Sequence, residues 1–369
     1  MIMNNKRKSI FIIAQGIEGG ITKMAGALAR GLVSRGCACK IVYIGRPAAT
    51  DRTAKDKQHG VESEAIVTGK ARSLGEAAGL LKSLFPVWRF LEAAKPDAVI
   101  FAGFVPALLY PSLLRPWTKA KFIFWDHGPQ NTFQSVKKLF FPFSLKFIDR
   151  IVSISKSSAL ALQNVFGIDG KKIEVVYNGA DPEPWQSLPL APDFSSLHVI
   201  MPARLDINSK DHATLIKAAA SLRNQGVAIE VTLAGSGPNR KEIMAVIEEN
   251  RAGDYVHCCP YMEDLPSLVV RHNVVCLSSK FEGLGMALVE GMLARRVVVA
   301  SRVAGCSEVI DDGETGFLFE PGSVEDCAAK LVALMKRNDL DNIREQGYRK
   351  AREKFSPENM VAEFMRIVG

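Results

Sequence analysis

Short runs of apolar, β-forming residues recur along the chain, and most of them are followed by a loop and then by a segment with helical periodicity. Runs with so few polar interruptions are typical of strands buried on both faces of a parallel sheet. The first run, residues 9–15, leads through a glycine loop into a helix with one alanine- and leucine-rich face, and then into a strand at 40–44. The chain therefore opens as a β-α-β unit with a tight glycine crossover.

The rest of the first half repeats this alternation with one interruption. Residues 51–75 are polar and charged without a clear period, so we expect an irregular loop there. Helices are predicted at 80–94, around Pro86, and at 155–166. Further strands are predicted at 97–101, 121–125, 148–154 and 173–176.

A proline-rich segment separates this series from a second one. Residues 181–197 contain four prolines and no hydrophobic period, which is typical of a linker. Two successive series of strand, loop and helix predict an α/β protein with two doubly wound, Rossmann-like domains that face each other across a cleft. The strands predicted for the second series are 198–202, 229–234, 255–259, 274–277, 297–300 and 316–319.

The stretch 280–296, KFEGLGMALVEGMLARR, carries the chemistry of the second series. It follows a predicted strand and continues into strong helix formers, so Gly283 and Gly285 lie in a turn at the start of a helix. Glycines let backbone amides approach a ligand, and the first helical turn adds its own unpaired N–H groups. Together they favour an anion such as a phosphate. Glu282 and Glu290 flank the site, about two helical turns apart.

This arrangement suits one extended ligand, with phosphates at the helix start and hydroxyl-rich parts that reach the two carboxylates. A nucleotide-sugar has that layout. The alternative is an ordinary amphipathic helix with a surface glutamate, and the surrounding motifs decide between the two.

Composition is that of a globular protein, because 47% of the 369 residues are hydrophobic, enough for a large core in two domains. The first eight residues are polar and basic, and the apolar run at 10–14 is too short for a signal peptide or a membrane span. We therefore expect the protein in the cytoplasm. Seven cysteines, with no C-x-x-C and no histidine at ligand spacing, predict reduced thiols and no metal site.

Charge divides the chain unevenly. Residues 1–190 carry 26 Lys and Arg against 14 Asp and Glu, whereas residues 191–369 carry 21 against 25. The basic half predicts an acidic partner, which is an anionic bilayer surface, a phosphorylated substrate or nucleic acid. Nucleic acid is disfavoured because the basic residues are scattered without an aromatic-interleaved recognition motif. The alternative is a lysine-rich surface that contacts only water.

Aromatic residues alternate with cations in this half, which favours a peripheral, salt-sensitive contact with an anionic membrane. For the aromatics near Pro86 the alternative is a place in the core. The residues predicted to lie at the interface are Trp88, Phe90, Trp117, Phe133, Phe140, Phe141 and Phe143, with Lys82, Arg89, Arg115, Lys137, Lys138 and Lys146 between them.

A further candidate, His127, directly follows a predicted strand and precedes Gly128. Ligand-binding residues of open parallel sheets collect beyond the carboxyl ends of the strands. His127 is therefore placed to face a cleft, with a purely structural role as the alternative.

The order and spacing of the motifs in both halves resemble those of GT-B-fold, family-four retaining glycosyltransferases, the glycosyl transferases group 1. Two departures from the family pattern are Asp211, where glycine is common, and residues 304–307, which replace a common G-G-x-P. The motifs are GIEGG at 16–20, HG at 127–128, YNGAD at 177–181, PARL at 202–205, SKDHATLI at 209–216, AGSGP at 234–238, EGLGMALVE at 282–290, GCSEVI at 305–310 and DDGETGFLF at 311–319.

The resemblance implies a division of labour between the domains. Residues 1–185 would bind the acceptor and residues 186–354 the nucleotide-sugar, while the closing helix at about 355–369 packs back on the first domain. It also implies that Arg204 and Lys210 hold the diphosphate in place of a metal, so that no cofactor is needed. Glu290 would bind the ribose. Glu282 would lie beside the donor sugar as a positioning acid.

The same resemblance implies that backbone groups complete the diphosphate cradle and that His127 contacts sugar hydroxyls or the acceptor region. The cradle residues are Gly19, Gly20, Gly235, Gly283, Leu284 and Gly285.

The implied activity is retaining transfer of a sugar from a nucleotide-sugar, with UDP as the expected nucleotide. The acceptor would be a saccharide or a lipid-linked molecule in cell-surface polysaccharide, lipopolysaccharide or glycoconjugate synthesis at the inner face of the membrane. A nicotinamide-dependent oxidoreductase is disfavoured, because Gly45 and Arg46 stand where an acidic residue should end the second strand. A nucleotide-sugar epimerase or a phosphorylase on the same fold remains an alternative.

Overall fold

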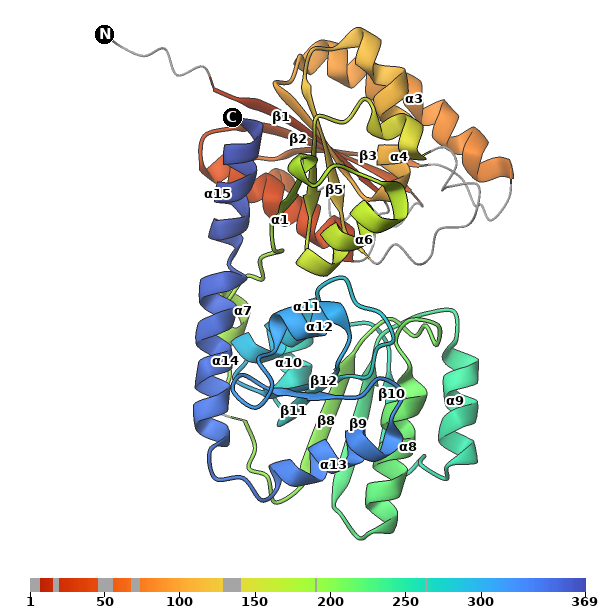
Figure 1. Cartoon of the computed structure of the whole chain (residues 1–369), viewed down its shortest axis with the longest axis vertical. Coiled ribbons are helices and arrows are strands. Elements are labelled where there is room, and N and C mark those ends of the chain that lie inside the picture. The colour runs from red at the N-terminus through yellow and green to blue at the C-terminus, as the bar shows by residue number, and fades with distance from the viewer. Residues whose placement is uncertain are drawn as a thin grey trace. The chain divides into compact units, whose positions relative to one another are not determined.

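A computed structural model describes residues 7–15, 20–45, 56–67, 74–128, 141–189, 191–262 and 264–369 of the chain. The chain divides into two compact units. Unit 1 comprises Met1–Gly179 and Pro357–Gly369, and unit 2 comprises Ala180–Ser356. Each unit is built on one parallel sheet flanked by helices (Figure 1).

Unit 1 contains a seven-stranded sheet in the order β3-β2-β1-β4-β5-β6-β7, and every neighbouring pair is parallel. The order runs outward from β1 and β4, as in a doubly wound sheet. Its elements are β1 Ser9–Gln15, α1 Gly20–Ser34, β2 Ala38–Gly45, β3 Glu62–Val67, α3 Leu74–Ala94, β4 Ala98–Ala102, α4 Phe104–Leu114, the 3-10 helix η1 Arg115–Trp117, β5 Lys121–Asp126, β6 Arg150–Ser153, α6 Lys156–Phe166, η3 Gly170–Lys172, β7 Ile173–Val175 and α15 Pro357–Val368.

Strand β3 shows that the loop predicted for 51–75 was wrong at residues 62–67. These residues pair in parallel with β2, and Lys40 Nζ lies 3.6 Å from Glu62 Oε2. The strand lies at the edge of the sheet, and none of residues 62–66 is buried. An edge strand tolerates charged side chains, so it lacks the apolar run by which the buried strands were recognised.

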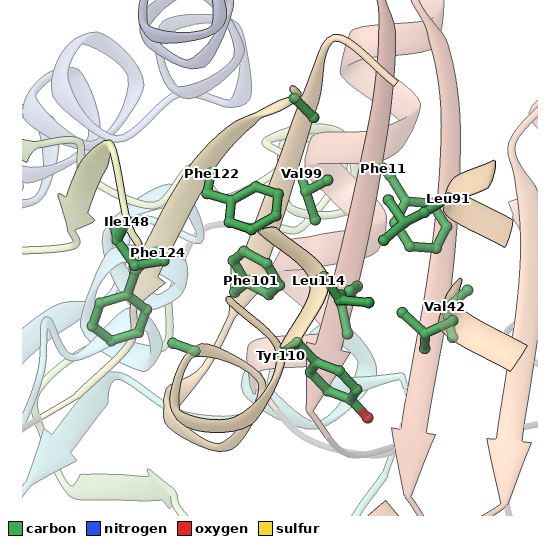
Figure 2. Close-up of a cluster of buried hydrophobic side chains, with 14 of the residues drawn as sticks. Phe11, Val42, Leu91, Val99, Phe101, Tyr110, Leu114, Phe122, Phe124 and Ile148 are labelled. Atoms are coloured by element: carbon green, nitrogen blue, oxygen red, sulfur yellow. The ribbon is translucent and has the colours of Figure 1, made fainter. Parts of the chain in front are cut away.

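The core of unit 1 lies between the sheet and the α3–α4 layer. Alternate strand residues such as Phe11, Phe101 and Phe122 point toward this layer, and Tyr110 and Leu114 of α4 pack against them (Figure 2). The rings of Phe101 and Phe122 meet edge to face, with their centroids 5.2 Å apart. Because helices cover this face, the strands are apolar at nearly every position.

Phe141 also belongs to this core, and its predicted place at a membrane interface is wrong. Its side chain is fully buried and meets the rings of Phe124 and Phe166 edge to face, at centroid distances of 5.4 and 4.9 Å. Phe90 is only partly buried, with Lys40 Nζ 4.3 Å above its ring. Four of the predicted interface residues, Phe133, Lys137, Lys138 and Phe140, and the side chain of Lys82, lie outside the described residues.

The opposite face of the sheet is covered by α1 and α15, although α15 follows the whole of unit 2 in the chain. Phe364 packs edge to face on Trp125, with centroids 4.8 Å apart. Lys121 Nζ donates a 2.5 Å hydrogen bond to the carbonyl of Ile367. A Cβ at Gly31 would collide with Val361, so α1 and α15 approach closely because position 31 has no side chain.

Unit 2 contains a six-stranded, wholly parallel sheet in the order β10-β9-β8-β11-β12-β13. Its elements are α7 Glu183–Gln186, β8 Leu197–Pro202, α8 His212–Asn224, β9 Ile229–Ala234, α9 Arg240–Glu249, β10 Val256–Cys259, α10 Leu265–Val269, β11 Val274–Leu277, α11 Met286–Leu293, β12 Val297–Ser301, α12 Ala304–Val309, β13 Phe317–Phe319, α13 Val324–Leu334 and α14 Leu340–Lys354.

The proline-rich segment packs on unit 2. Asn273 Nδ2 donates to the carbonyls of Asp193 and Ser196 at 2.7 and 2.8 Å. The buried guanidinium of Arg296 donates to the carbonyl of Pro189 at 3.1 Å. Two side chains of unit 2 thus satisfy backbone acceptors in the part of this segment that follows α7 and precedes β8.

Candidate active site

The loops that follow β8 and β11 lie side by side at the carboxyl edge of the unit 2 sheet. These two strands are neighbours, and the strand order reverses direction between them. Such a switch point is where open α/β sheets bind ligands. Arg204 and Lys210 lie beyond β8, Gly235 lies beyond β9, and residues 282–285 lie beyond β11.

Lys210 and Glu282 form an ion pair between the two loops. Lys210 Nζ lies 2.5 Å from Glu282 Oε1, and their side chains are only 21% and 10% exposed. Ser279 donates a further 2.8 Å hydrogen bond to the same carboxylate oxygen. The sequence places Lys210 at a diphosphate and Glu282 beside a sugar, and the structure brings the two side chains into direct contact.

Backbone hydrogen bonds hold these loops together. The amides of Lys280 and Phe281 donate to the carbonyl of Ser209 at 2.8 and 3.3 Å. The hydroxyl of Ser278 donates to the carbonyl of Asp211 at 2.8 Å. The position of the Lys210–Glu282 pair is therefore set by the backbone.

Asp211 has a left-handed backbone, with φ +48°, immediately before α8. This conformation accounts for the glycine that is common at this position in the resembling family, because glycine adopts it without steric cost. Aspartate is among the few other residues that tolerate it. Here its carboxylate also accepts a 2.8 Å hydrogen bond from the Thr214 hydroxyl.

The glycine turn before α11 presents backbone donors. Gly285 has φ +79° and caps the helix, and Gly283, Leu284 and Gly285 are all buried. In the part of the chain that the structure describes, the amides of these three residues donate to no backbone or side-chain acceptor. Buried N–H groups without partners at a helix start are an anion site. A Cβ at Gly305 would collide with the carbonyl of Glu282, so α12 closes tightly over this turn.

Glu290 lies on the second turn of α11 and is 9% exposed. A carboxylate with so little exposure to water is stable only where hydrogen-bond donors surround it. The sequence alternative of a freely exposed surface glutamate is wrong.

Arg204 differs from Lys210 in its surroundings. Its side chain is exposed, and its guanidinium forms no ion pair or hydrogen bond with any described residue. Gly235 has a packing role, because a Cβ there would collide with the carbonyl of Ala203, and the amide of Leu205 donates to the carbonyl of Ser236 at 3.2 Å. The turns after β8 and β9 are thus in backbone contact.

In unit 1, His127 follows β5 at the carboxyl edge of the sheet. Its ring lies 4.3 Å from that of Trp125, and its Nε2 is buried without a hydrogen-bond partner among the described residues. Burial lowers the pKa of His127 to about 3, so the imidazole is neutral. Gly20 is the exposed first residue of α1, and Gly19 lies outside the described residues.

Sequence reasoning missed Ser209, Ser278 and Ser279, which position the Lys210–Glu282 pair, and Cys306. The two serines at 278–279 directly follow the apolar run of β11, and small polar residues at the carboxyl end of a buried strand are a usable signal. The buried thiol of Cys306 has its pKa raised, first by burial and then by Glu282, which locates it beside the carboxylate. No pattern in the sequence pointed to that proximity.

Among the residues that the structure describes, no group of three or more His, Cys, Asp or Glu side chains could hold a metal ion. Metal-independent chemistry stays a prediction. No described helix is both long and apolar enough to span a bilayer.

Two family models match the chain in succession. Residues 18–184 match the model described as Glycosyltransferase Family 4, and residues 195–354 match the one described as Glycosyl transferases group 1. Together they leave only residues 1–17, 185–194 and 355–369 unmatched.

Relatives and solved structures agree with these matches. The putative glycosyltransferase EpsD of Bacillus subtilis is 31% identical over 169 residues, 46% of this chain and 44% of EpsD. The MMP alpha-(1->4)-mannosyltransferase of Mycolicibacterium hassiacum is 28% identical over 229 residues, 60% of this chain and 54% of that enzyme. The matches thus span about half the length of these relatives.

The crystal structure of Anabaena HepE in complex with UDP and glucose aligns with a TM-score of 0.82 at 18% identity, over 98% of this chain and 99% of that one. At this identity the likeness concerns the fold. With the two doubly wound sheets, it confirms the predicted two-domain α/β fold of GT-B type.

Proposed function

Because the chain belongs to the group 1 glycosyltransferases, we propose that it transfers a sugar from a UDP-sugar to a saccharide or lipid-linked acceptor with retention of configuration. The acceptor belongs to cell-surface polysaccharide, lipopolysaccharide or glycoconjugate synthesis. UDP is the proposed nucleotide because the structure of HepE, which shares the fold, contains UDP and glucose.

The observation that carries the proposal is the Lys210–Glu282 pair beside the unpaired amides of the glycine turn. The departing group of a nucleotide-sugar is a nucleoside diphosphate, whose negative charge grows in the transition state. Fixed cations and preorganised N–H donors stabilise such charge. The amides of Gly283, Leu284 and Gly285 have no acceptor among the described residues, so they would donate to the diphosphate, and Lys210 would supply the adjacent positive charge.

Arg204 is the second proposed cation. Its guanidinium is free of partners among the described residues, so no existing ion pair has to break before it meets a phosphate. A guanidinium also binds phosphate through two parallel hydrogen bonds. We assign Arg204 and Lys210 to the diphosphate.

Glu290 and Glu282 are assigned to the two neutral ends of the donor. Glu290 would accept hydrogen bonds from the ribose hydroxyls, which suits its small exposure. Glu282 would position the donor sugar and exchange part of its contact with Lys210 for sugar hydroxyls. The diphosphate then takes over the neutralisation of Lys210.

Retention is proposed to follow a front-face route, in which the departing phosphate accepts the acceptor proton. Glu282 is a positioning acid in this route and forms no covalent bond. His127 is neutral because burial lowers its pKa to about 3, so it would act on sugar hydroxyls or the acceptor as a hydrogen-bonding group.

The proposed location is the cytoplasm, at the inner face of the membrane. The basic charge of residues 1–190 supports it, since a lipid-linked acceptor would be presented at an anionic surface.

A donor screen tests the proposal. The protein is incubated with UDP-, GDP- and ADP-sugars, and release of each nucleoside diphosphate is measured with and without EDTA. We expect release from a UDP-sugar that EDTA does not reduce, and a product with the anomeric configuration of the donor by NMR. Turnover of no nucleotide-sugar would overturn the proposal, and inversion would overturn the front-face route.

A further inference from the structure

The outer surface of the α3–α4 layer carries exposed aromatic side chains that the transfer step does not use. Phe85 is 63% exposed and Trp117 is 68% exposed. The ring of Trp88 lies with its centroid 5.8 Å from that of Phe85 and 5.8 Å from that of Trp117. Leu113, four positions before Trp117, is also exposed. We call Phe85, Trp88, Leu113 and Trp117 the aromatic patch.

These exposed side chains are not needed to fill the core. On the same helices, Val87 and Leu91 of α3 and Leu114 of α4 are buried against the sheet and fill the core. Phe85, Leu113 and Trp117 are therefore exposed on the surface of this layer. Trp88 is partly buried, packs against the core and links the rings of Phe85 and Trp117. A cluster of exposed aromatics of this kind marks a surface that binds a partner.

Two exposed cations lie next to patch residues in the chain. Arg89 is exposed one position beyond Trp88, and Lys119 is exposed two positions beyond Trp117. Within residues 82–121 six Lys and Arg stand against two Asp and Glu. A partner that covers the patch therefore meets apolar aromatic surface and positive charge together.

We propose that the aromatic patch docks unit 1 on the surface of an anionic lipid bilayer. Phe85 and Trp117 would enter the boundary between headgroups and acyl chains, where Trp and other aromatic side chains are favoured. Arg89 and Lys119 would contact the anionic headgroups. An anionic bilayer therefore matches both the apolar aromatic side chains and the positive charge of this surface.

A second copy of the chain is the weaker candidate for the same surface. A two-fold interface brings the same residues of both copies together. Arg89 and Lys119 of one copy would then lie near those of the other, and like charges at an interface oppose association.

The patch differs from the surface predicted from the sequence. Phe85 joins it, whereas Phe141 is in the core and Arg115 is paired with Asp149 at 2.9 Å. The inference rests on the proposed membrane-face location and is independent of the transfer step.

Co-sedimentation with vesicles of phosphatidylglycerol and phosphatidylcholine tests the inference. We expect the full chain to bind at low salt and to dissociate at high salt, because screening shortens the reach of charge. Phe85→Ala with Trp117→Ala and, separately, Arg89→Glu with Lys119→Glu should each weaken binding at least about tenfold.

The chain offers a matched control for each pair. Lys171→Glu with Lys172→Glu makes the same change in net charge at two exposed residues of η3, elsewhere on unit 1. Leu160→Ala removes an apolar side chain that is 56% exposed on α6. Both controls should weaken binding by less than about threefold. Leu160 does not belong to the patch, and salt screens the interaction between charges that are farther apart than a Debye length.

Tryptophan fluorescence gives a second measurement. The chain has four tryptophans, and Trp125 and Trp185 are buried. A blue shift on vesicle binding would therefore report on Trp88 and Trp117, and Trp117→Phe should remove most of it.

The outcomes separate the inference from the proposed function. Absence of binding to anionic vesicles at low salt would overturn the inference, as would binding that the patch variants leave unchanged. A dimer in solution that Phe85→Ala with Trp117→Ala dissolves would also overturn it in favour of a second copy. Donor hydrolysis should be the same in the patch variants and in the unaltered chain. If the unaltered chain hydrolyses no donor, that result would count only against the proposed transferase activity.

Discussion

Lys210 Nζ and Glu282 Oε1 lie 2.5 Å apart although 72 positions separate the two residues in the chain. Both side chains are largely shielded from water, and Ser279 bonds the same carboxylate oxygen. In such a shielded pair, removal of one partner leaves the other charge unsatisfied. Any anion that binds Lys210 must therefore compete with Glu282, which makes this contact the most informative one to alter.

Lys210→Ala and Arg204→Ala should each lower turnover by at least about a hundredfold, the scale for loss of one group that stabilises developing charge. Steady-state rates of UDP-sugar hydrolysis measure the effect, with circular dichroism to verify folding. Lys217→Ala, on the exposed side of α8, is the matched control and should keep the original rate. A folded Arg204→Ala or Lys210→Ala protein with a near-normal rate would remove that residue from the site.

Glu282→Gln should lower kcat with the acceptor more than it changes UDP affinity. The amide keeps the shape but loses the charge that neutralises Lys210, so Lys210 becomes freer to bind the diphosphate. We expect UDP, measured by calorimetry, to bind as tightly as before or more tightly. Weaker binding of UDP would show that Glu282 holds the nucleotide rather than the sugar.

Glu290→Gln should weaken binding of UDP and barely change binding of 2′-deoxy-UDP. A hydrogen bond to a charged group contributes about 1.5 to 3 kcal/mol, so the loss for UDP should be about tenfold or more. Glu249→Gln, at an exposed position of α9, serves as control. Equal weakening of both nucleotides would mean that Glu290 stabilises α11 and does not bind ribose.

Gly305→Ala should lower turnover at least about tenfold, since the new Cβ would collide with the carbonyl of Glu282 and displace the loop. Gly253→Ala is the control, because a Cβ there meets no atom within 4 Å. Thermal unfolding distinguishes a shifted loop from a general loss of stability. Comparable activity of both variants would show that the Glu282 loop tolerates the shift.

Much of the fold follows from the sequence because both sheets are parallel and covered on both faces. Their inner strands must be apolar throughout, and the runs at 9–15 and 274–277 mark them directly. Edge strand β3 is an exception, because the side chains of residues 62–66 are not buried. The location of Phe141 was predicted wrongly because several basic residues lie within a few positions of it in the sequence. Its place in the core depends on contacts with Phe104, Phe124 and Phe166.

The residues of the candidate site were predicted from their type and from their position after strands. The contact between Lys210 and Glu282 was not predicted. That Lys210 meets Glu282 depends on the adjacency of β8 and β11 and on the carbonyl of Ser209, which receives two amides from the other loop. Neither the strand adjacency nor the role of this carbonyl can be recognised in the pattern of polar and apolar residues. The left-handed backbone of Asp211 is likewise visible only as a departure from an expected glycine.

Buried histidines predict how stability depends on pH. Burial is the main cause that lowers the pKa of His127 to about 3 and the pKa values of His212 and His272 to about 4. In the unfolded chain a histidine has a pKa of about 6.5. The unfolded chain therefore binds more protons below that value, and the stabilisation is complete above pH ~6.5 and is lost as the pH falls toward 4.

We expect the unfolding free energy of unit 2 to fall by up to about 1.4 kcal/mol per pH unit for each of His212 and His272. His272 has a neutral ring in which Nδ1–H donates to the carbonyl of Leu268 and Nε2 accepts from the Thr232 hydroxyl, at 2.8 and 2.9 Å. In urea titrations between pH 7 and 4, His272→Asn should show a shallower slope than the original chain. A slope in His272→Asn equal to that of the original chain would remove His272 from the pH dependence.

The attachment of α15 to unit 1 has a consequence for biosynthesis. A ribosome completes residues 1–179, then all of unit 2, and only then the helix whose Phe364 covers Trp125. Until that moment the nascent first unit presents an uncovered apolar face beside α1. That face stays open until α15 has been synthesised, and during this interval the nascent unit exposes apolar surface of the kind that chaperones and proteases recognise.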